Sequence, residues 1–189
     1  GEEPRGQAEA IRKQSLLIRQ LIEDLNLTSK LEYHAQPLRM QEYCPAVLLR
    51  ETVAEYYNEG LDERYEITVQ AAHQTERIRQ QGDVPLLKRA LRNVIGNSIR
   101  HNPEGCRIML QLSEDMGWIV WRLWDSGPGI PEKVVDALEG EASGPGEEVH
   151  VMGLRIVRQI ITAHGGHADF VRNEEGSYGV EFVMPVEFG

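Results

Sequence analysis

The stretch LLKRALRNVIGNSIRHNPEG, residues 86–105, is typical of an amphipathic helix that ends in a turn. One face of this helix is largely apolar and comprises Leu87, Ala90, Leu91, Val94, Ile95, Ser98 and Ile99. Asn93, Asn97 and Arg100 are spaced so that they form one adjacent polar stripe. Asparagine is unfavourable inside a helix because its amide competes for backbone hydrogen bonds. The stripe therefore indicates either a solvated helix face or a binding site.

The residue types of this stripe suit a metal–phosphate ligand. An asparagine carbonyl oxygen is a hard, neutral donor of the kind that Mg²⁺ accepts. An arginine one turn later can meet phosphate oxygens.

A second polar position follows the strand-like run WIVWRLW, residues 118–124. Asp125 stands there before Gly127 and Gly129 in the sequence WDSGPGIP, residues 124–131. A carboxylate at this point can accept a hydrogen bond from an amine, such as the exocyclic amine of adenine. Glycines allow the backbone to approach a flat ring closely. Asp-Ser-Gly is also common turn chemistry, so an Asx turn is the alternative.

A third feature is the helix that we expect from Gly153 to His164, within HVMGLRIVRQIITAHGG, residues 150–166. Helix N-termini bind anions through free N–H groups and the helix dipole. An ordinary helix with a glycine near its N-terminus is the alternative.

The rest of the chain alternates helical and strand-like patterns without a strict βαβ repeat, which favours an α+β layered sandwich. The expected elements are a helix over 8–33, a short strand over 38–43, a helix over 46–60, a strand over 65–72, two strands over 106–115 and 117–125, a glycine- and glutamate-rich loop over 138–148 and a closing hairpin over 167–186.

Composition excludes several classes of protein. The 189 residues are 41% hydrophobic with a net charge of −10, which argues against a free nucleic-acid binder. Cys44 and Cys106 give neither a disulfide framework nor metal-ligand spacing, and they suit a reducing, cytosolic protein. No apolar run is long enough for a membrane span. Because the chain begins in a charged helical pattern, we expect it to be cut from a longer protein, which could carry a membrane span.

Taken in order, the three features resemble the N, G1 and G2 boxes of sensor histidine kinases. That family belongs to an ATPase superfamily with DNA gyrase, a heat-shock chaperone and a mismatch-repair ATPase. The resemblance runs from about Met40 to Pro185. It implies a two-layer α/β sandwich, in which a mixed, mostly antiparallel sheet carries three main helices on one face and is preceded by one helix. It also implies an ATP-binding catalytic domain over 37–189 and, over 1–36, the second helix of a truncated dimerisation and phospho-acceptor hairpin.

The resemblance implies roles for particular residues. Asn93 and Asn97 match the N-box asparagines, and Asn97 matches the Mg²⁺ ligand. Asp125 matches the aspartate that recognises adenine. Asn93, Asn97 and Arg100 form the implied catalytic set. The further nucleotide-binding positions that the resemblance implies are His101, Gly127, Gly129, Ile130, Gly153 and Leu154.

Some positions depart from the family pattern. Arg100 and His101 stand where the family usually has Lys and Tyr, and His101 could make phosphate contact pH-dependent. Val151 replaces the first glycine of the Gly-x-Gly-Leu motif, and Val180 replaces a common threonine near adenine. Arg89 stands where some relatives carry an acidic residue or glutamine, so no general base is assigned. The phenylalanine-bearing box between G1 and G2 is not recognisable, which indicates an altered ATP lid.

The function implied is transfer of the γ-phosphoryl group of ATP to a histidine on the missing hairpin helix, and then to a response regulator. ATP and Mg²⁺ are the implied ligands, and the intact protein is expected to be a homodimer through its dimerisation helices. The expected location is cytoplasmic, as part of a membrane-anchored sensor, without nucleic-acid or membrane contact by this fragment. The alternative is a nucleotide-sensing or docking module without kinase activity. A gyrase- or chaperone-like ATPase fits less well, because the helix over 85–101 has no acidic residue.

Overall fold

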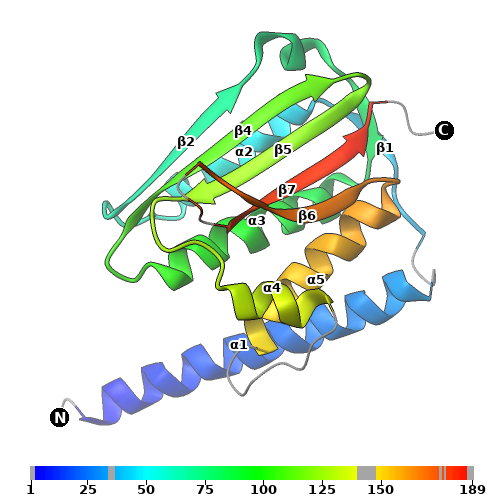
Figure 1. Cartoon of the computed structure of the whole chain (residues 1–189). Coiled ribbons are helices and arrows are strands. Elements are labelled where there is room, and N and C mark those ends of the chain that lie inside the picture. Colours follow the sequence, from blue (N-terminus) through cyan, green and yellow to red (C-terminus); the bar gives the residue numbers. More distant parts are fainter. Residues whose placement is uncertain (1–2, 34–36, 140–147, 175, 177, 187–189) are drawn as a thin grey trace.

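The computed structural model describes residues 3–33, 37–139, 148–174, 176 and 178–186 (Figure 1). Along the chain, the elements are α1 (Glu3–Glu32), β1 (Gln41–Tyr43), α2 (Pro45–Asn58), β2 (Tyr65–Ala71), the 3-10 helix η1 (His73–Arg77), β3 (Gln80–Gly82), α3 (Val84–His101), β4 (Cys106–Asp115), β5 (Trp118–Asp125), α4 (Glu132–Glu139), α5 (Glu148–Ala163), β6 (His167–Arg172) and β7 (Tyr178–Pro185).

The main sheet has five strands in the order β2-β4-β5-β7-β6. β2 runs parallel to β4, and the other neighbouring pairs are antiparallel. Helices α2, α3 and α5 cover one face of this sheet (Figure 1). The expected α+β sandwich with a mixed, mostly antiparallel sheet is therefore confirmed.

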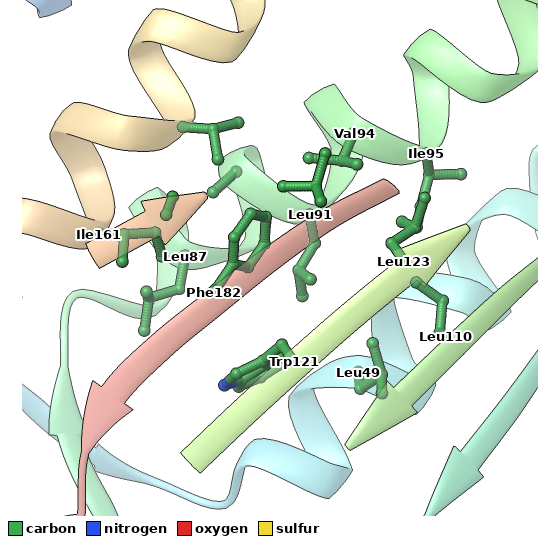
Figure 2. Packing of buried hydrophobic residues seen from close by; sticks show 14 of the residues in the cluster. Leu49, Leu87, Leu91, Val94, Ile95, Leu110, Trp121, Leu123, Ile161 and Phe182 are labelled. Atoms are coloured by element: carbon green, nitrogen blue, oxygen red, sulfur yellow. The ribbon is translucent and has the colours of Figure 1, made fainter. Parts of the chain in front are cut away.

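The core lies between the sheet and these helices (Figure 2). Alternate residues of the central strands point into it, as Leu110 and Leu123 do, while α3 contributes its apolar face, including Leu91 and Ile95. Burying one such side chain contributes roughly 1.5–3 kcal/mol. The same helix therefore supplies the core on one face and holds Asn97 beside the end of β5 and the start of β7.

Three features of the fold differ from the expectations. β1 and β3 pair as a separate two-stranded antiparallel sheet, although β3 was not expected. α4 forms where only a loop and an altered lid were expected. α5 begins at Glu148, so Gly153 lies inside the helix and does not open it. Residues 140–147, which include most of the expected glycine- and glutamate-rich loop, lie outside the described residues.

Helix α1 packs along α5 and also contacts α3 (Figure 1). Leu27 and Leu31 are buried there, and the buried carboxylate of Asp24 pairs with the guanidinium of Arg89 from α3. Ile22 is among the apolar α1 side chains that remain exposed. Among the described helices, none has an apolar segment that is long enough to cross a bilayer.

A buried histidine links α5 to the start of α3. Nε2 of His164 accepts a hydrogen bond from the Asp83 backbone N–H at 2.9 Å, and Nδ1 lies 2.7 Å from the Ile160 carbonyl oxygen. A neutral ring with its proton on Nδ1 satisfies both contacts. Burial lowers the pKa of His164 below its ordinary value of 6.5, although the Ile160 bond and Asp83 oppose the shift.

We expect this histidine to make the fold less stable in mild acid. Since the pKa of His164 is lower in the folded chain, the unfolded chain binds more protons as the pH falls through 6.5. Stability is therefore highest above pH 6.5, and this one group removes at most about 1.4 kcal/mol by about pH 5.5. Urea unfolding should be measured above pH 6.5 and at about pH 5.5. The free energy of unfolding should fall less with acid in His164→Gln than in the wild-type protein, because glutamine cannot titrate. An equal acid loss in both proteins would contradict the prediction.

Candidate nucleotide-binding site

A narrow pocket of about 20 Å³ lies between α3, the end of β5 and the start of β7. The candidate residues that line it are Asn97, His101, Asp125, Gly129, Ile130 and Leu154. The structure thus brings together side chains from each of the three sequence features. A larger hollow lies on the uncovered sheet face, and Trp124 and Asp125 border both spaces.

Asn97 gives the strongest indication that this pocket binds a ligand. It is buried, and its Nδ2 atom has no hydrogen-bond partner among the described residues. Leaving a buried amide group unpaired costs about 1–3 kcal/mol, so such a group indicates a missing ligand. The two ends of an asparagine amide are exchangeable by rotation. When the amide is reversed, its carbonyl oxygen becomes the unpartnered atom, and this atom fits a Mg²⁺ ion.

Asn93 lies one turn before Asn97 and makes a different contact. Its Nδ2 donates to the carbonyl oxygen of Gly153 at 3.4 Å, so it joins α3 to α5. A Cβ on Gly153 would lie 3.9 Å from Nδ2 of Asn97, which places this glycine beside the buried amide. Asn93 and Gly153 therefore support the edge of the pocket and do not line it.

The expected helix start at Gly153 is wrong, whereas a role of Gly153 in nucleotide binding stays a prediction. Because α5 begins at Glu148, the free N–H groups of its first turn belong to about residues 148–151. The backbone N–H of Gly153 lies deeper in the helix, where it is used within the helix. Leu154 lines the pocket as an apolar wall.

Asp125 is half-buried at the mouth of the pocket and forms a turn as well. Its Oδ1 accepts the backbone N–H of Gly127 at 3.0 Å, as expected for an Asx turn. Ser126 is held on β4 at the same place, because its N–H donates to the carbonyl of Arg107 at 2.9 Å. The turn uses one carboxylate oxygen and leaves the second for a ligand. The two interpretations of this sequence are therefore compatible.

Gly127 and Gly129 have separate reasons to be glycine. A Cβ on Gly127 would lie 1.8 Å from Oδ1 of Asn102, so the constraint is a side chain of the protein and not a bound ring. Gly129 has φ 72°, a left-handed conformation that favours glycine, and it lines the pocket beside Ile130.

Arg100 and His101, the last two residues of α3, lie in different surroundings. His101 lines the pocket. Burial and the nearby Arg100 lower the pKa of its imidazole below 6.5, while Asp125 opposes the shift, so the ring is neutral at pH 7. Arg100 is exposed, and its Nη2 would lie 3.9 Å from a Cβ on Gly96, which faces Tyr56 of α2. The guanidinium of Arg100 is thus not part of the pocket.

Residues outside the three sequence motifs also contribute. Ser98, Tyr178, Gly179 and Val180 line the pocket. Val180 is buried and lies at the position where the expected threonine is missing. The resemblance places Val180 near adenine, whereas the sequence gives no direct signal for this role of Ser98, Tyr178 and Gly179.

Comparisons with known proteins indicate the family of this chain. The family model described as histidine kinase-, DNA gyrase B- and HSP90-like ATPase matches residues 82–188. The sensor protein BasS of Escherichia coli is 31% identical over 170 residues, which cover 85% of this chain and 45% of BasS. The sensor histidine kinase YvrG of Bacillus subtilis is 25% identical over 175 residues, covering 87% of this chain and 29% of YvrG. The chain thus spans less than half the length of either relative.

Solved structures share the fold. The histidine kinase AdeS of Acinetobacter baumannii superposes with a TM-score of 0.73 at 17% identity, over 94% of this chain and 83% of AdeS. The histidine kinase ThkA, solved in complex with the response regulator protein TrrA, superposes with a TM-score of 0.67 at 20% identity, over 94% of this chain and 48% of ThkA.

Proposed function

This chain belongs to the histidine kinase-, DNA gyrase B- and HSP90-like ATPase family, and from that premise we propose that it is the ATP-binding catalytic part of a sensor histidine kinase. The observation that carries this proposal is the pocket in which Asn97 of α3 lies opposite the carboxylate of Asp125 at the end of β5; Nδ2 of Asn97 has no hydrogen-bond partner in the part of the chain that the structure describes. One group suits a metal ion and the other suits an amine. A Mg-adenine nucleotide carries both.

In this proposal, the side chains mainly bind and orient ATP. Asp125 accepts a hydrogen bond from the six-amine of adenine. Guanine binds less well, because its six-carbonyl offers no donor to this carboxylate. Leu154 and Ile130 form the apolar wall against the base. Asn97 would hold Mg²⁺, which supplies charge neutralisation at the phosphates when it is bound. His101 faces the same space, and a neutral imidazole there can donate a hydrogen bond to the ligand.

The reaction would be transfer of the γ-phosphoryl group to a histidine of the intact protein, and then to an aspartate of a response regulator. Residues 1–36 would be the second helix of a dimerisation hairpin, and residues 37–189 the catalytic domain. The exposed apolar side chains of α1 support this assignment, because a hairpin mate would cover them. We place this part of the protein on the cytoplasmic side of a membrane-anchored sensor.

One observation favours the second candidate, a nucleotide-sensing module without kinase activity. Arg89 stands at the position that is acidic in some relatives, and it forms an ion pair with Asp24 of α1. A guanidinium stays protonated near neutral pH, so this side chain cannot act as a base, and its ion pair holds α1. Val151 in place of the first glycine of the Gly-x-Gly-Leu motif also favours a module without kinase activity.

Calorimetric titration of ATP, with and without Mg²⁺, tests the proposal. We expect saturable binding that becomes tighter when Mg²⁺ is present. Absence of binding at millimolar ATP would overturn it. A chain extended by its preceding hairpin helix should then incorporate label from γ-labelled ATP. Tight binding without incorporation would favour the sensing module.

A further inference from the structure

Asn102, the C-cap residue of α3, is buried between this helix and the loop that follows β5. Its Nδ2 donates to the carbonyl oxygen of Ser98 at 2.8 Å. Its own carbonyl oxygen accepts Tyr65 Oη at 2.9 Å and the N–H of Gly105 at 2.9 Å. The end of α3 is therefore fixed by bonds from both the side chain and the backbone of one residue.

The other end of the Asn102 amide reaches the loop that carries Asp125. Its Oδ1 lies so close to Gly127 that a Cβ there would be 1.8 Å away. Gly127 in turn donates its N–H to Oδ1 of Asp125 at 3.0 Å. A continuous chain of contacts thus runs from α3 through the Asn102 amide to the carboxylate at the pocket mouth.

We propose that Asn102 is a positioning residue, which orients the Asp125 carboxylate and thereby sets the selectivity of the pocket for the base of the nucleotide. The inference rests on the proposed function and deepens it. The Asn102 amide fixes the backbone of Gly127, and the Gly127 N–H fixes one carboxylate oxygen. The second oxygen then keeps a constant direction toward the base. Asn102 also ties this loop to the helix that carries Asn97, so the base and metal positions are held at a constant separation.

The physical reason is preorganisation. A carboxylate on a glycine-containing loop has several accessible orientations, and only some of them meet an amine in the pocket. Binding must then include the cost of ordering that loop. A side chain that is already packed against the loop removes this cost in advance. Without it, the loss should fall on ligands that use the carboxylate.

The variant Asn102→Ser separates this role from helix capping. A serine hydroxyl can donate to the carbonyl four residues earlier, so the bond to Ser98 can persist. Its shorter side chain withdraws the oxygen from Gly127. The matched control is Thr52→Ala in α2, because the buried Thr52 Oγ1 makes the same kind of bond, to the Leu48 carbonyl at 2.8 Å. Thr52 lies outside the pocket.

The experiment compares ATP with inosine triphosphate, whose base has a carbonyl at the six-position and a proton on N1 in place of the six-amine and the unprotonated N1 of adenine. We expect the wild-type protein to prefer ATP. In Asn102→Ser, the affinity for ATP should fall about tenfold while the affinity for inosine triphosphate stays constant, so the preference collapses. Thr52→Ala should lower the melting temperature and keep the preference.

Two results would overturn the proposal. One is an unchanged preference in Asn102→Ser, and the other is an equal loss for both nucleotides, which marks a purely structural residue. Failure of the wild-type protein to bind ATP is a separate outcome and rejects the proposed function. If Asn102→Ser does not fold, Ser126→Gly provides the second variant, because it loosens the same loop at its anchor on Arg107. Retention of the full preference in that variant would also count against positioning through the loop.

Discussion

Replacing Asp125 with asparagine should weaken ATP binding by about a hundredfold while the protein remains folded. Asparagine keeps an oxygen that accepts the Gly127 N–H, so the turn after β5 can persist. Its amide group, however, presents a donor where the six-amine of adenine also presents donors. A hydrogen bond to a charged group contributes about 1.5–3 kcal/mol, and the clash of donors adds to its loss. Calorimetry with ATP and Mg²⁺ measures the change, and thermal unfolding checks the fold.

Asp115→Asn is the matched control for this prediction. Asp115 is an exposed carboxylate at the end of β4, so the variant removes the same charge away from the pocket. It should bind ATP as the wild-type protein does. Inosine triphosphate should lose its disadvantage in Asp125→Asn, because the new amide can donate to the six-carbonyl. Equal ATP affinity in Asp125→Asn and the wild-type protein would mean that Asp125 serves only as a turn residue.

The sequence predicts the central elements well because they have strong periodic patterns. The expected helix over 85–101 becomes α3 from Val84 to His101, and the two expected strands become β4 and β5. β1 and β3 have only three residues each, which is too short for a pattern. The N-terminal part of α5 was missed because the glycine at 153 was interpreted as a helix start. A glycine inside a helix costs about 1 kcal/mol, and burial of the apolar face of α5, which includes Ile156 and Ile160, outweighs this cost.

The candidate site could be predicted only in part, because some of its contacts join residues that are far apart in the sequence. The motifs supply Asn97, Asp125 and Leu154, which do meet in one pocket. The contact of Asn102 with Gly127 joins the end of a helix to a loop beyond two strands, so no local pattern reveals it. The partner of Arg89 is even more distant, 65 residues earlier in the chain. Such pairings depend on tertiary packing, which a periodic pattern does not encode.

Replacing Asp24 with leucine should loosen α1 from α3 and α5. Asp24 is 5% exposed and pairs with Arg89, whose Nε has no hydrogen-bond partner among the described residues. Removing one member of a buried pair costs about 3–5 kcal/mol because the other charge stays buried. The side chain of Arg89 is 28% exposed, so we expect a smaller cost of about 2 kcal/mol. This corresponds to a roughly thirtyfold increase in the opening of α1.

Hydrogen exchange of the α1 amides is the direct measurement, since a helix that loses its partner is marginal in water. Protection between Asp24 and Glu32 should fall in Asp24→Leu, while the sheet stays protected. Glu23→Leu is the matched control, because Glu23 is the exposed neighbour. The double variant Asp24→Leu with Arg89→Met should recover protection, because an apolar pair can replace a buried ion pair without loss. Unchanged protection in Asp24→Leu would mean that Leu27 and Leu31 hold α1 without the ion pair. The position of α1 on α3 and α5 would then depend on apolar contact alone.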